Sequence, residues 1–411
     1  MRKLKWLYPG MFVKRWIFLM ALGIIFIAMG FAMVISEKTP ESKTFAATIV
    51  ILGGLIVITG VSRIIKSFVV VFSPQSGKEL VEKVYQRRIL EKGPRIVTIG
   101  GGTGLSTLLQ GLKEYTSNIT AVVTVADDGG SSGRLRVEFN VLPPGDIRNC
   151  LVGLADAGPL MEKLFQFRFD TGNSLKGHNF GNLFITAMSK VTGDFEAAVE
   201  ASSKILAIRG SVVPATLAKV VLRAQHEDGT ETLGESNIPK NPSPIKKMYI
   251  SPAECKPTKA ALEAIKRAHA IVLGPGSLYT SVMPNLIIKG MYEAIKNSKA
   301  MKIYVCNVMT QAGETDGYTA SDHIKAIIEH TGSGIIDYCM INTEKIPLGL
   351  LEKYKSERAY PVAADKEAIE ELGCKAVEAN VINTKNLVRH NSEKLAKIIV
   401  DLIGSVKKHN I

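Results

Sequence analysis

Two long uncharged runs dominate the hydrophobic pattern near the N-terminus. Residues 16–35 and 45–61 contain no charged side chain, and a short polar loop, 36–44, separates them. As a helix, the first run is long enough to cross a hydrocarbon core of about 30 Å, and the second lies at the lower limit. The pattern predicts a two-helix transmembrane hairpin within residues 1–72, with 64–72 either continuing the second helix or lying in the membrane interface.

Basic residues flank both ends of this hairpin. The positive-inside rule therefore predicts a multi-pass protein of the inner (cytoplasmic) membrane, with both termini and the main domain in the cytoplasm. A cleaved signal peptide is disfavoured, because the first run is too long, no small-residue cleavage site follows it and a second run is present. The flanking basic residues are Arg2, Lys3, Lys5, Lys14, Arg15, Arg63 and Lys66.

Beyond the hairpin the pattern changes to that of a folded α/β domain. A breaker cluster at 73–77 and a charged stretch at 78–92 predict a linker and a helix over 73–94, followed by the main domain at 95–411. Short β-branched runs then alternate with helical patterns, which is typical of a mostly parallel sheet with helices on both faces. The expected strands are 95–99, 119–125, 270–273, 302–306 and 335–341, and the clearest helices are 258–268, 319–330 and 392–403.

One segment departs from this alternation. Residues 219–224 and 231–233 flank an Asp-Gly turn at 227–230, which predicts a β-hairpin, and a further strand-like run follows at 246–250. We expect residues 215–250 to form a small β excursion from the main fold.

Charge and cysteine usage narrow the class of protein. The net charge is +13, and most of the basic surplus lies in residues 1–92, beside the hairpin. This distribution indicates a membrane surface rather than nucleic acid as the partner. The five cysteines are scattered and form no Cys-x-x-Cys pair, which argues against a zinc site or a disulfide framework and fits a reducing compartment.

Candidate chemistry lies in the loops after the expected strands, where open parallel sheets bind their ligands. The first loop, Gly100-Gly101-Gly102-Thr103-Gly104, exposes backbone N–H groups and leads into a helix, which suits a phosphate or another anion. It is not a Walker A loop, and Thr107 occupies the third glycine position of a dinucleotide fingerprint. This motif alone does not distinguish a phosphate-binding loop from a tight turn that binds no ligand.

The second loop makes a binding function the better interpretation. Asp127 and Asp128 can accept ribose hydroxyls or hold Mg²⁺, and the small residues Gly129, Gly130, Ser131 and Ser132 offer N–H and hydroxyl donors. Arg134 or Arg136 can bind phosphate through a forked pair of hydrogen bonds.

Three further loops carry similar residues. Structural alternatives are an N-cap role for Asp146, a structural imidazole for His178 and a rim aromatic for Tyr279, which could otherwise stack on a base or bind a sugar. The candidates from these loops are Gly145, Asp146, Asn149, His178, Asn182, Gly276, Ser277 and Tyr279.

Taken together, the loop motifs resemble the bacterial gluconeogenesis-factor (YvcK-like) family, which is related to 2-phospho-L-lactate transferase (CofD-like). The resemblance runs from about Arg95 to the C-terminus, and the hairpin lies outside it. The motifs are GGGTGLSTLLQGLK, TVADDGGSSGRLR, PPGDIRN, GHNFGNL, GPGSLYTSVMPN and CNVMTQAGETDGYTASDH.

The resemblance implies a Rossmann-like domain that binds a UDP-sugar, notably UDP-N-acetylglucosamine, and regulates cell shape and wall-precursor supply under gluconeogenic growth. We expect a non-catalytic regulator with the diphosphate on Gly101–Gly104 and 129–132, ribose or Mg²⁺ on Asp127 or Asp128, and the base or sugar at Tyr279. Arg358 resembles a family arginine near the site and would neutralise phosphate.

Three alternatives stay open. A Mg²⁺-dependent transferase, as in the related branch, would use Asp127 and Asp128 as metal ligands and catalytic candidates. An NAD-dependent oxidoreductase is the weakest, because the third glycine is missing. A scaffold would recruit cell-wall synthesis or regulatory proteins, or further copies of the chain, at the membrane lipid, and we expect no nucleic acid among the partners.

Overall fold

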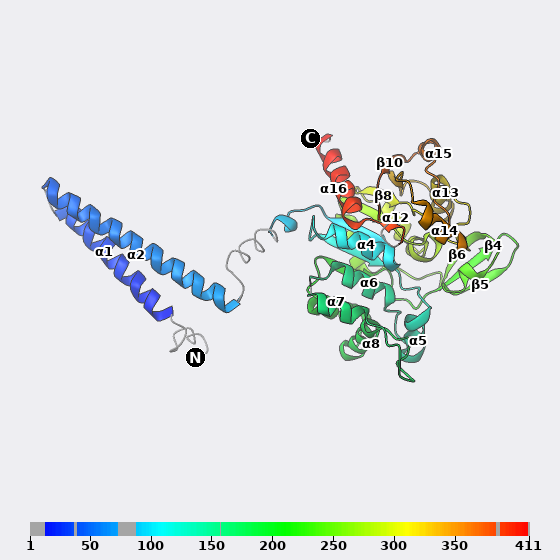
Figure 1. Cartoon of the computed structure of the whole chain (residues 1–411), viewed down its shortest axis with the longest axis horizontal. Coiled ribbons are helices and arrows are strands. Elements are labelled where there is room, and N and C mark those ends of the chain that lie inside the picture. Colours follow the sequence, from blue (N-terminus) through cyan, green and yellow to red (C-terminus); the bar gives the residue numbers. More distant parts are fainter. Residues whose placement is uncertain (1–12, 37–38, 73–87, 157, 384–386, 410–411) are drawn as a thin grey trace. The chain divides into compact units, whose positions relative to one another are not determined.

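The computed structural model describes residues 13–36, 39–72, 88–156, 158–383 and 387–409 (Figure 1). The chain divides into two compact units, Met1–Arg88 and Ile89–Ile411. The expected linker and most of the expected charged helix lie outside the described residues, although 88–91 are helical.

The first unit is a hairpin of two long helices, α1 (Val13–Ser36) and α2 (Pro40–Phe72). Both are long and apolar enough to cross a membrane. The helices approach closely at glycines, because a Cβ on Gly23 would lie 2.9 Å from the carbonyl oxygen of Gly53 and one on Gly53 would lie 2.8 Å from that of Gly23. Close backbone approach at small residues is the usual packing mode of helices in lipid.

The outward side chains of this hairpin are large and apolar, with Phe18 70% and Ile35 85% exposed. A surface of this kind is unfavourable in water and suits a hydrocarbon environment. Of the two possibilities for residues 64–72, the structure has the continuing helix, because α2 runs without a break to Phe72.

The second unit contains a seven-stranded, wholly parallel sheet in the order β10-β9-β8-β7-β1-β2-β3. All five expected strands are present within one to three residues at their ends. The sheet has two more strands, β3 and β10. The strands are β1 (Ile96–Gly100), β2 (Ile119–Val123), β3 (Ser211–Pro214), β7 (Ala270–Leu273), β8 (Met301–Val305), β9 (Tyr338–Asn342) and β10 (Lys375–Ala379).

Helices cover both faces of this sheet, as the pattern predicted. On one face α4 packs between α6 and α16, and on the other α10, α11 and α12 pack together. The helices are α4 (Gly102–Leu112), α5 (Gly130–Phe139), α6 (Gly145–Leu154), α7 (Pro159–Gln166), α8 (Phe180–Thr192), α9 (Phe195–Ile205), α10 (Lys259–Arg267), α11 (Met283–Leu286), α12 (Met291–Lys296), α13 (Ala320–Thr331), α14 (Leu348–Ser356), α15 (Lys366–Glu371) and α16 (Ser392–His409).

The predicted β excursion is confirmed as a separate three-stranded antiparallel sheet, in the order β5-β4-β6. A pair of two-residue strands near the C-terminus and two short helical turns complete the described elements. These are β4 (Val221–His226), β5 (Glu231–Leu233), η2 (Ile238–Lys240), β6 (Ile245–Ser251), η3 (Leu278–Val282), β11 (Ile382–Asn383) and β12 (Arg389–His390).

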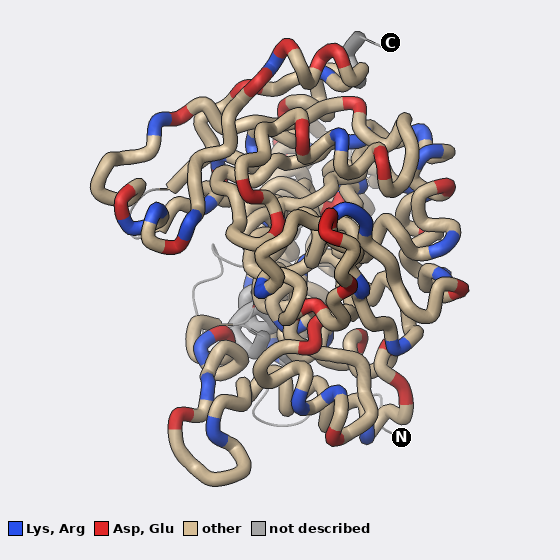
Figure 2. The backbone as a smooth tube through the Cα atoms, turned by 90° about the vertical axis from the view of Figure 1, so that its right-hand side faces the viewer, with Lys and Arg blue, Asp and Glu red and all other residues tan. Residues whose placement is uncertain are grey.

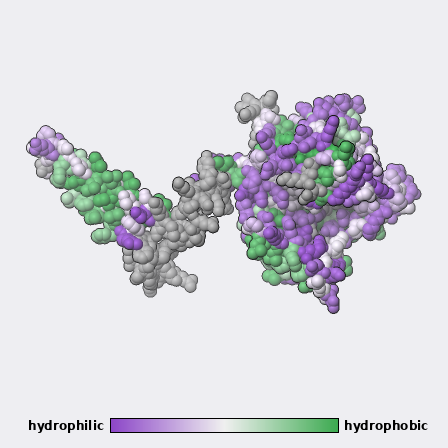
Figure 3. Space-filling model, in the orientation of Figure 1, coloured by the Kyte–Doolittle hydropathy of each residue, from purple (hydrophilic) through white to green (hydrophobic). Residues whose placement is uncertain are grey.

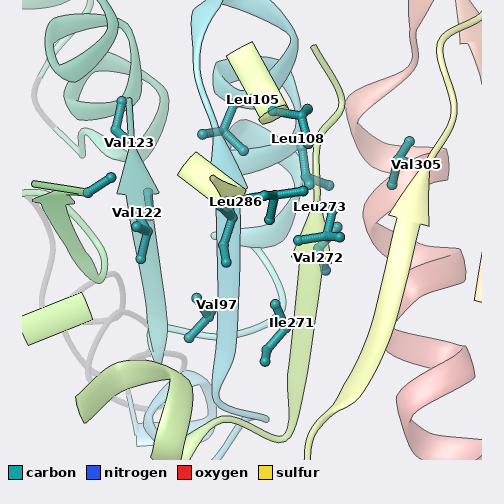
Figure 4. Close-up of a cluster of buried hydrophobic side chains, with 14 of the residues drawn as sticks. Val97, Leu105, Leu108, Val122, Val123, Ile271, Val272, Leu273, Leu286 and Val305 are labelled. Carbon is teal, nitrogen blue, oxygen red and sulfur yellow. The ribbon is translucent and has the colours of Figure 1, made fainter. Parts of the chain in front are cut away.

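Buried aliphatic side chains hold the central strands to their helices (Figure 4). Val97 and Val272 of the central strands are at most 2% exposed, as are Leu105 and Leu108 of α4 and Leu286 of α11. The five cysteines are all free and buried.

Candidate functional site

The strand order places a topological switch point between β1 and β7. From β1 the chain proceeds to β2 on one side, whereas β7 continues to β8 on the other. Loops diverge at such a point and leave a crevice beyond the carboxyl ends of the strands. Here the diverging loops are the glycine turn after β1 and Gly274-Pro275-Gly276 after β7.

A cavity of about 580 Å³ opens at this switch point. Its size lies within the range of small-molecule sites. We call it the switch-point cavity. It is lined by Gly101–Gly104, Thr107, Pro239, Pro275–Ser277, Ser281, Asn307–Ala312, Glu314, Tyr354, Glu357, Ala359 and Val388–His390.

The glycine turn packs directly against the loop after β7. A Cβ on Gly104 would lie 2.7 Å from the carbonyl oxygen of Pro275, so only glycine permits this approach. Gly102 has a φ of +66°, in the left-handed region that favours glycine. The glycines therefore shape the junction of two loops and turn the N-terminus of α4 towards the cavity.

Polar side chains hold the opposite rim. Gln311 donates from Nε2 to Ser277 Oγ (2.8 Å), and Asn307 donates from Nδ2 to Gln311 Oε1 (3.3 Å). Below the rim, the buried Asn285 donates to the carbonyl oxygens of Ser281 (2.7 Å) and Gly100 (3.3 Å). These bonds tie the loop after β8 and α11 to the switch point.

The C-terminal segment closes the outer wall of the cavity. Arg389 is the one Lys or Arg among the described residues that line it. Burial lowers the pKa of His390 to about 4, so this imidazole is neutral at pH 7. Tyr354 Oη accepts a hydrogen bond from Val388 N (3.0 Å), which fixes α14 to the segment that carries Arg389. Sequence reasoning missed Arg389 and His390, since no motif marks them.

A second group of candidates gathers beyond the end of β2, outside the cavity lining. We call it the serine–histidine cluster: Ser131, Ser132, His178, Asn179 and Asn182. Ser131 Oγ lies 3.1 Å from His178 Nδ1, and Asn182 Nδ2 donates to Ser132 Oγ (3.3 Å). The expected loops thus do meet, but as hydrogen-bonded N-termini of α5 and α8.

Arg148 carries positive charge into this cluster. Its guanidinium donates to Asn182 Oδ1 (3.1 Å) and Asn149 Oδ1 (2.6 Å). Arg134, which we expected to bind phosphate, instead donates to the carbonyl oxygen of Lys176 (3.0 Å).

The paired acids do not form a metal site by themselves. Asp127 Oδ1 accepts from Gly129 N (2.9 Å), and Asp128 Oδ1 accepts from Ser236 N (2.9 Å), so each carboxylate holds a backbone turn. Within the described ranges, no group of three or more His, Cys, Asp or Glu side chains could hold a metal ion.

Asp146 links the two regions. Its carboxylate accepts a hydrogen bond from Gly102 N–H at the start of α4, and the missing Cβ of Gly101 leaves room for it. Burial and the nearby Asp127 raise the pKa of Asp146 to about 7. One amide of the glycine turn is therefore already paired with a carboxyl group of the protein.

Two further acids belong to this region and were not among the candidate residues that the sequence analysis named. Burial and the nearby acids, Asp127 first among them, raise the pKa of Glu235 to about 8. Burial likewise raises the pKa of Glu314 to about 7, against hydrogen bonds that include one from Thr280 Oγ1 (3.1 Å). The β excursion brings Glu235 back over the end of β2, which a linear reading of residues 215–250 could not show.

These raised pKa values predict a pH-dependent stability. A carboxyl whose folded pKa exceeds its unfolded value of about 4 stabilises the fold at low pH and loses that contribution as pH rises through the folded pKa. We expect residues 89–411 to lose stability between about pH 4, where these carboxyls ionise in the unfolded chain, and about pH 8, through Asp146 and Glu235, whose folded pKa values are about 7 and about 8.

Urea unfolding midpoints across this pH range test that prediction. Asp146→Asn together with Glu235→Gln should make the profile less steep, with part of the remaining slope due to Glu314, whose pKa is about 7, whereas Asp401→Asn, on the exposed side of α16, should leave it unchanged. A double variant whose profile parallels that of the unaltered domain would show that these acids do not cause the dependence.

Two expected ligand contacts lie elsewhere. Tyr279 is 2% exposed, and its hydroxyl pairs with that of Tyr318 (2.8 Å) in the core, so it does not reach the cavity. Arg358 is exposed, at φ +55°, between two lining residues but is not itself among them. The cavity therefore holds Gly101–Gly104, Gly276 and Ser277 of the expected set, whereas Gly100 ends the strand below it.

Charges of both signs are interspersed over the face that Figure 2 turns to the viewer. A continuous basic stripe of the kind that binds nucleic acid is not seen on that face.

A parallel sheet with this strand order and a ligand-sized cavity at its switch point define a doubly wound α/β domain. The family model for 2-phospho-L-lactate transferase CofD matches residues 96–382. Together with its curated relatives, this match shows that the chain belongs to the CofD-related gluconeogenesis factor family, as the loop motifs indicated.

Three relatives show how much of the chain the family covers. The gluconeogenesis factor of Bacillus subtilis is 49% identical over 75% of this chain and 98% of its own length. A relative from Nostoc sp., named for the same function, is 47% identical over 97% of this chain and 92% of its own. A crystal structure of a UPF0052-family protein from Bacillus halodurans matches with a TM-score of 0.73 and 49% identity, over 75% of this chain and 99% of that one.

Proposed function

We propose that this chain is a membrane-tethered regulator that binds a UDP-sugar, UDP-N-acetylglucosamine in the first instance, and adjusts cell shape and wall-precursor supply during gluconeogenic growth. The observation that carries the proposal is the switch-point cavity, whose lining combines the N-terminus of α4 with Arg389. Helix N-termini and arginine are the two groups that proteins most often use to bind phosphate.

The rest of the lining suits the other parts of a nucleotide sugar. Tyr354, Met309 and Val388 provide an apolar wall for a base or a sugar ring. Glu357 and the amide of Gln311 can bind hydroxyl groups. Since Asp146 occupies the amide of Gly102, we place the diphosphate on the amides of Thr103 and Gly104, facing Arg389.

The membrane tether rests on the hairpin. Its helices present apolar side chains outward and pack on each other through glycine. Arg15 and Arg63 both lie over the ring of Trp16, at 5.5 and 5.3 Å, which gathers cationic and aromatic groups at one end of the hairpin. Such residues favour a membrane–water interface, and by the positive-inside rule this end faces the cytoplasm.

The family model favours a second candidate, transfer from a nucleotide-activated donor. That reaction would call on Mg²⁺, and the arrangement of Asp127 and Asp128 does not supply a metal site by itself. We therefore prefer binding without turnover, and accumulation of a nucleoside monophosphate or diphosphate from the nucleotide sugar would favour the enzyme instead.

Calorimetry on residues 89–411 tests the proposed ligand. We expect UDP-N-acetylglucosamine to bind at micromolar concentration and UDP to bind more weakly, because UDP lacks the sugar contacts. N-acetylglucosamine alone should give no heat. If no nucleotide sugar binds below millimolar concentration, the proposal fails.

A further inference from the structure

Helix α7 carries a stripe of exposed apolar side chains that the cavity does not use. Leu160 is 81% exposed, Leu164 40% and Phe167, which follows the helix, 49%. The spacing of four residues places Leu160 and Leu164 on one side of the helix, and Phe167 comes directly after its last residue. We call this set, with Lys163 between its members, the α7 stripe.

The side of α7 opposite the stripe packs on the domain, whereas Leu160 and Leu164 of the stripe are exposed. Phe165 is buried and packs on α8, with ring centroids 5.0 Å from Phe184 and 6.0 Å from Phe180. Phe165 thus anchors α7 to the domain, whereas of the stripe Phe167 packs edge-on against Phe169, with ring centroids 5.1 Å apart. Figure 3 shows apolar surface gathered at the lower edge of this unit, where Figure 1 places α7 and α8.

The charged neighbours favour an anionic lipid surface. Lys163 is exposed on the helix beside Leu164, whereas Glu162 is half-buried. After the helix Arg168 and Asp170 are both exposed, and the Arg168 guanidinium donates to the carbonyl oxygen of Gly177 (2.7 Å). Leucine and phenylalanine interleaved with cations are the composition of segments that lie in the membrane interface, with the apolar side chains in the acyl boundary and the cations on headgroups.

Because the hairpin tethers the domain to the membrane, even the small α7 stripe provides enough surface for docking. If α2 ends at the cytoplasmic face, the connection at 72–88 keeps the domain within about 55 Å of the bilayer, the fully extended reach of that segment. Tethering turns docking into an intramolecular event, in which a weak contact is populated. A stable dimer needs about 800 Å² on each partner, more than these few side chains provide.

We propose that the α7 stripe docks the domain on the anionic membrane that the hairpin crosses. This inference rests on the membrane tether of the proposed function. It commits to lipid as the occupant of the stripe, and a second copy of the chain is an alternative that the test separates.

Vesicle flotation of residues 89–411 tests the inference without the hairpin. This unit folds on its own, since a crystallised relative that matches over 99% of its own length corresponds to 75% of this chain. We expect the domain to float with phosphatidylglycerol vesicles and far less with phosphatidylcholine. Leu160→Asp with Leu164→Asp should lower the floated fraction at least tenfold.

Matched measurements keep the outcomes distinct. Leu348→Asp removes a leucine that is 79% exposed on α14, and it should float like the unaltered domain. Thermal unfolding checks that each variant is folded. A domain that stays unbound, stripe variants that float undiminished, or a dimer that the stripe variants dissociate would each overturn the inference. Alkaline carbonate extraction of the full chain reports separately on the tether.

Discussion

Replacing Arg389 by glutamine is expected to lower the affinity for UDP-N-acetylglucosamine by ten- to hundred-fold. The substitution removes the one Lys or Arg side chain among the described residues that line the switch-point cavity. A hydrogen bond to a charged group contributes about 1.5–3 kcal/mol, which corresponds to that loss. Calorimetry on residues 89–411 measures it directly.

Arg358→Gln is the matched control, because Arg358 is an exposed arginine on the neighbouring segment that does not line the cavity. It should retain affinity within a factor of two or three. The reverse result, with Arg358 essential and Arg389 dispensable, would restore the expectation from the family resemblance and remove our placement of the diphosphate.

Gly104→Ala is expected to have the largest effect on stability among single changes at the cavity. The added Cβ would lie 2.7 Å from the carbonyl oxygen of Pro275, and a backbone atom cannot rotate away. Separating the two loops should cost about 1–3 kcal/mol of unfolding free energy, as overpacked sites do. Urea unfolding should show this loss together with weakened nucleotide-sugar binding.

Gly404→Ala provides the control for adding a methyl group at glycine. No atom lies within 4 Å of the position that its Cβ would take in α16. Alanine is favoured over glycine in a helix by about 1 kcal/mol, so this variant should be as stable as the parent or more so. If Gly104→Ala behaves in the same way, the close junction of the loops is not a constraint.

The hydrophobic pattern was enough to predict the main elements of the fold. Uninterrupted apolar runs such as 270–273 are buried strands because both faces of a parallel sheet are covered. The two strands that were not expected, β3 and β10, lack such runs. β3 ends in Pro214, and charged residues, Lys375 and Glu378, interrupt the apolar residues of β10. Both lie at the sheet edges, where a strand needs less apolar sequence.

The candidate site was predicted less completely, for a physical reason. Glycine turns after strands can be located from local sequence, and the turns after β1 and β7 do line the cavity. Sequence proximity cannot show which loops converge. The loop of Asp127 and Asp128 bonds to Ser236 of the β excursion, and Arg389 arrives from the far end of the chain.

Tyr279 is a residue that the sequence placed at the site and that the fold directs away from it. It follows a glycine-rich turn, as ligand-stacking aromatics do, yet η3 directs it into the core towards Tyr318. An aromatic residue beside a loop motif therefore says little until the direction of its side chain is known.

A crystal structure of residues 89–411 soaked with UDP-N-acetylglucosamine tests the central claim most directly. We predict the diphosphate within hydrogen-bond distance of the Thr103 and Gly104 amides and of Arg389, with the sugar nucleotide inside the switch-point cavity. Density for the ligand in the serine–histidine cluster, with the switch-point cavity empty, would contradict the account.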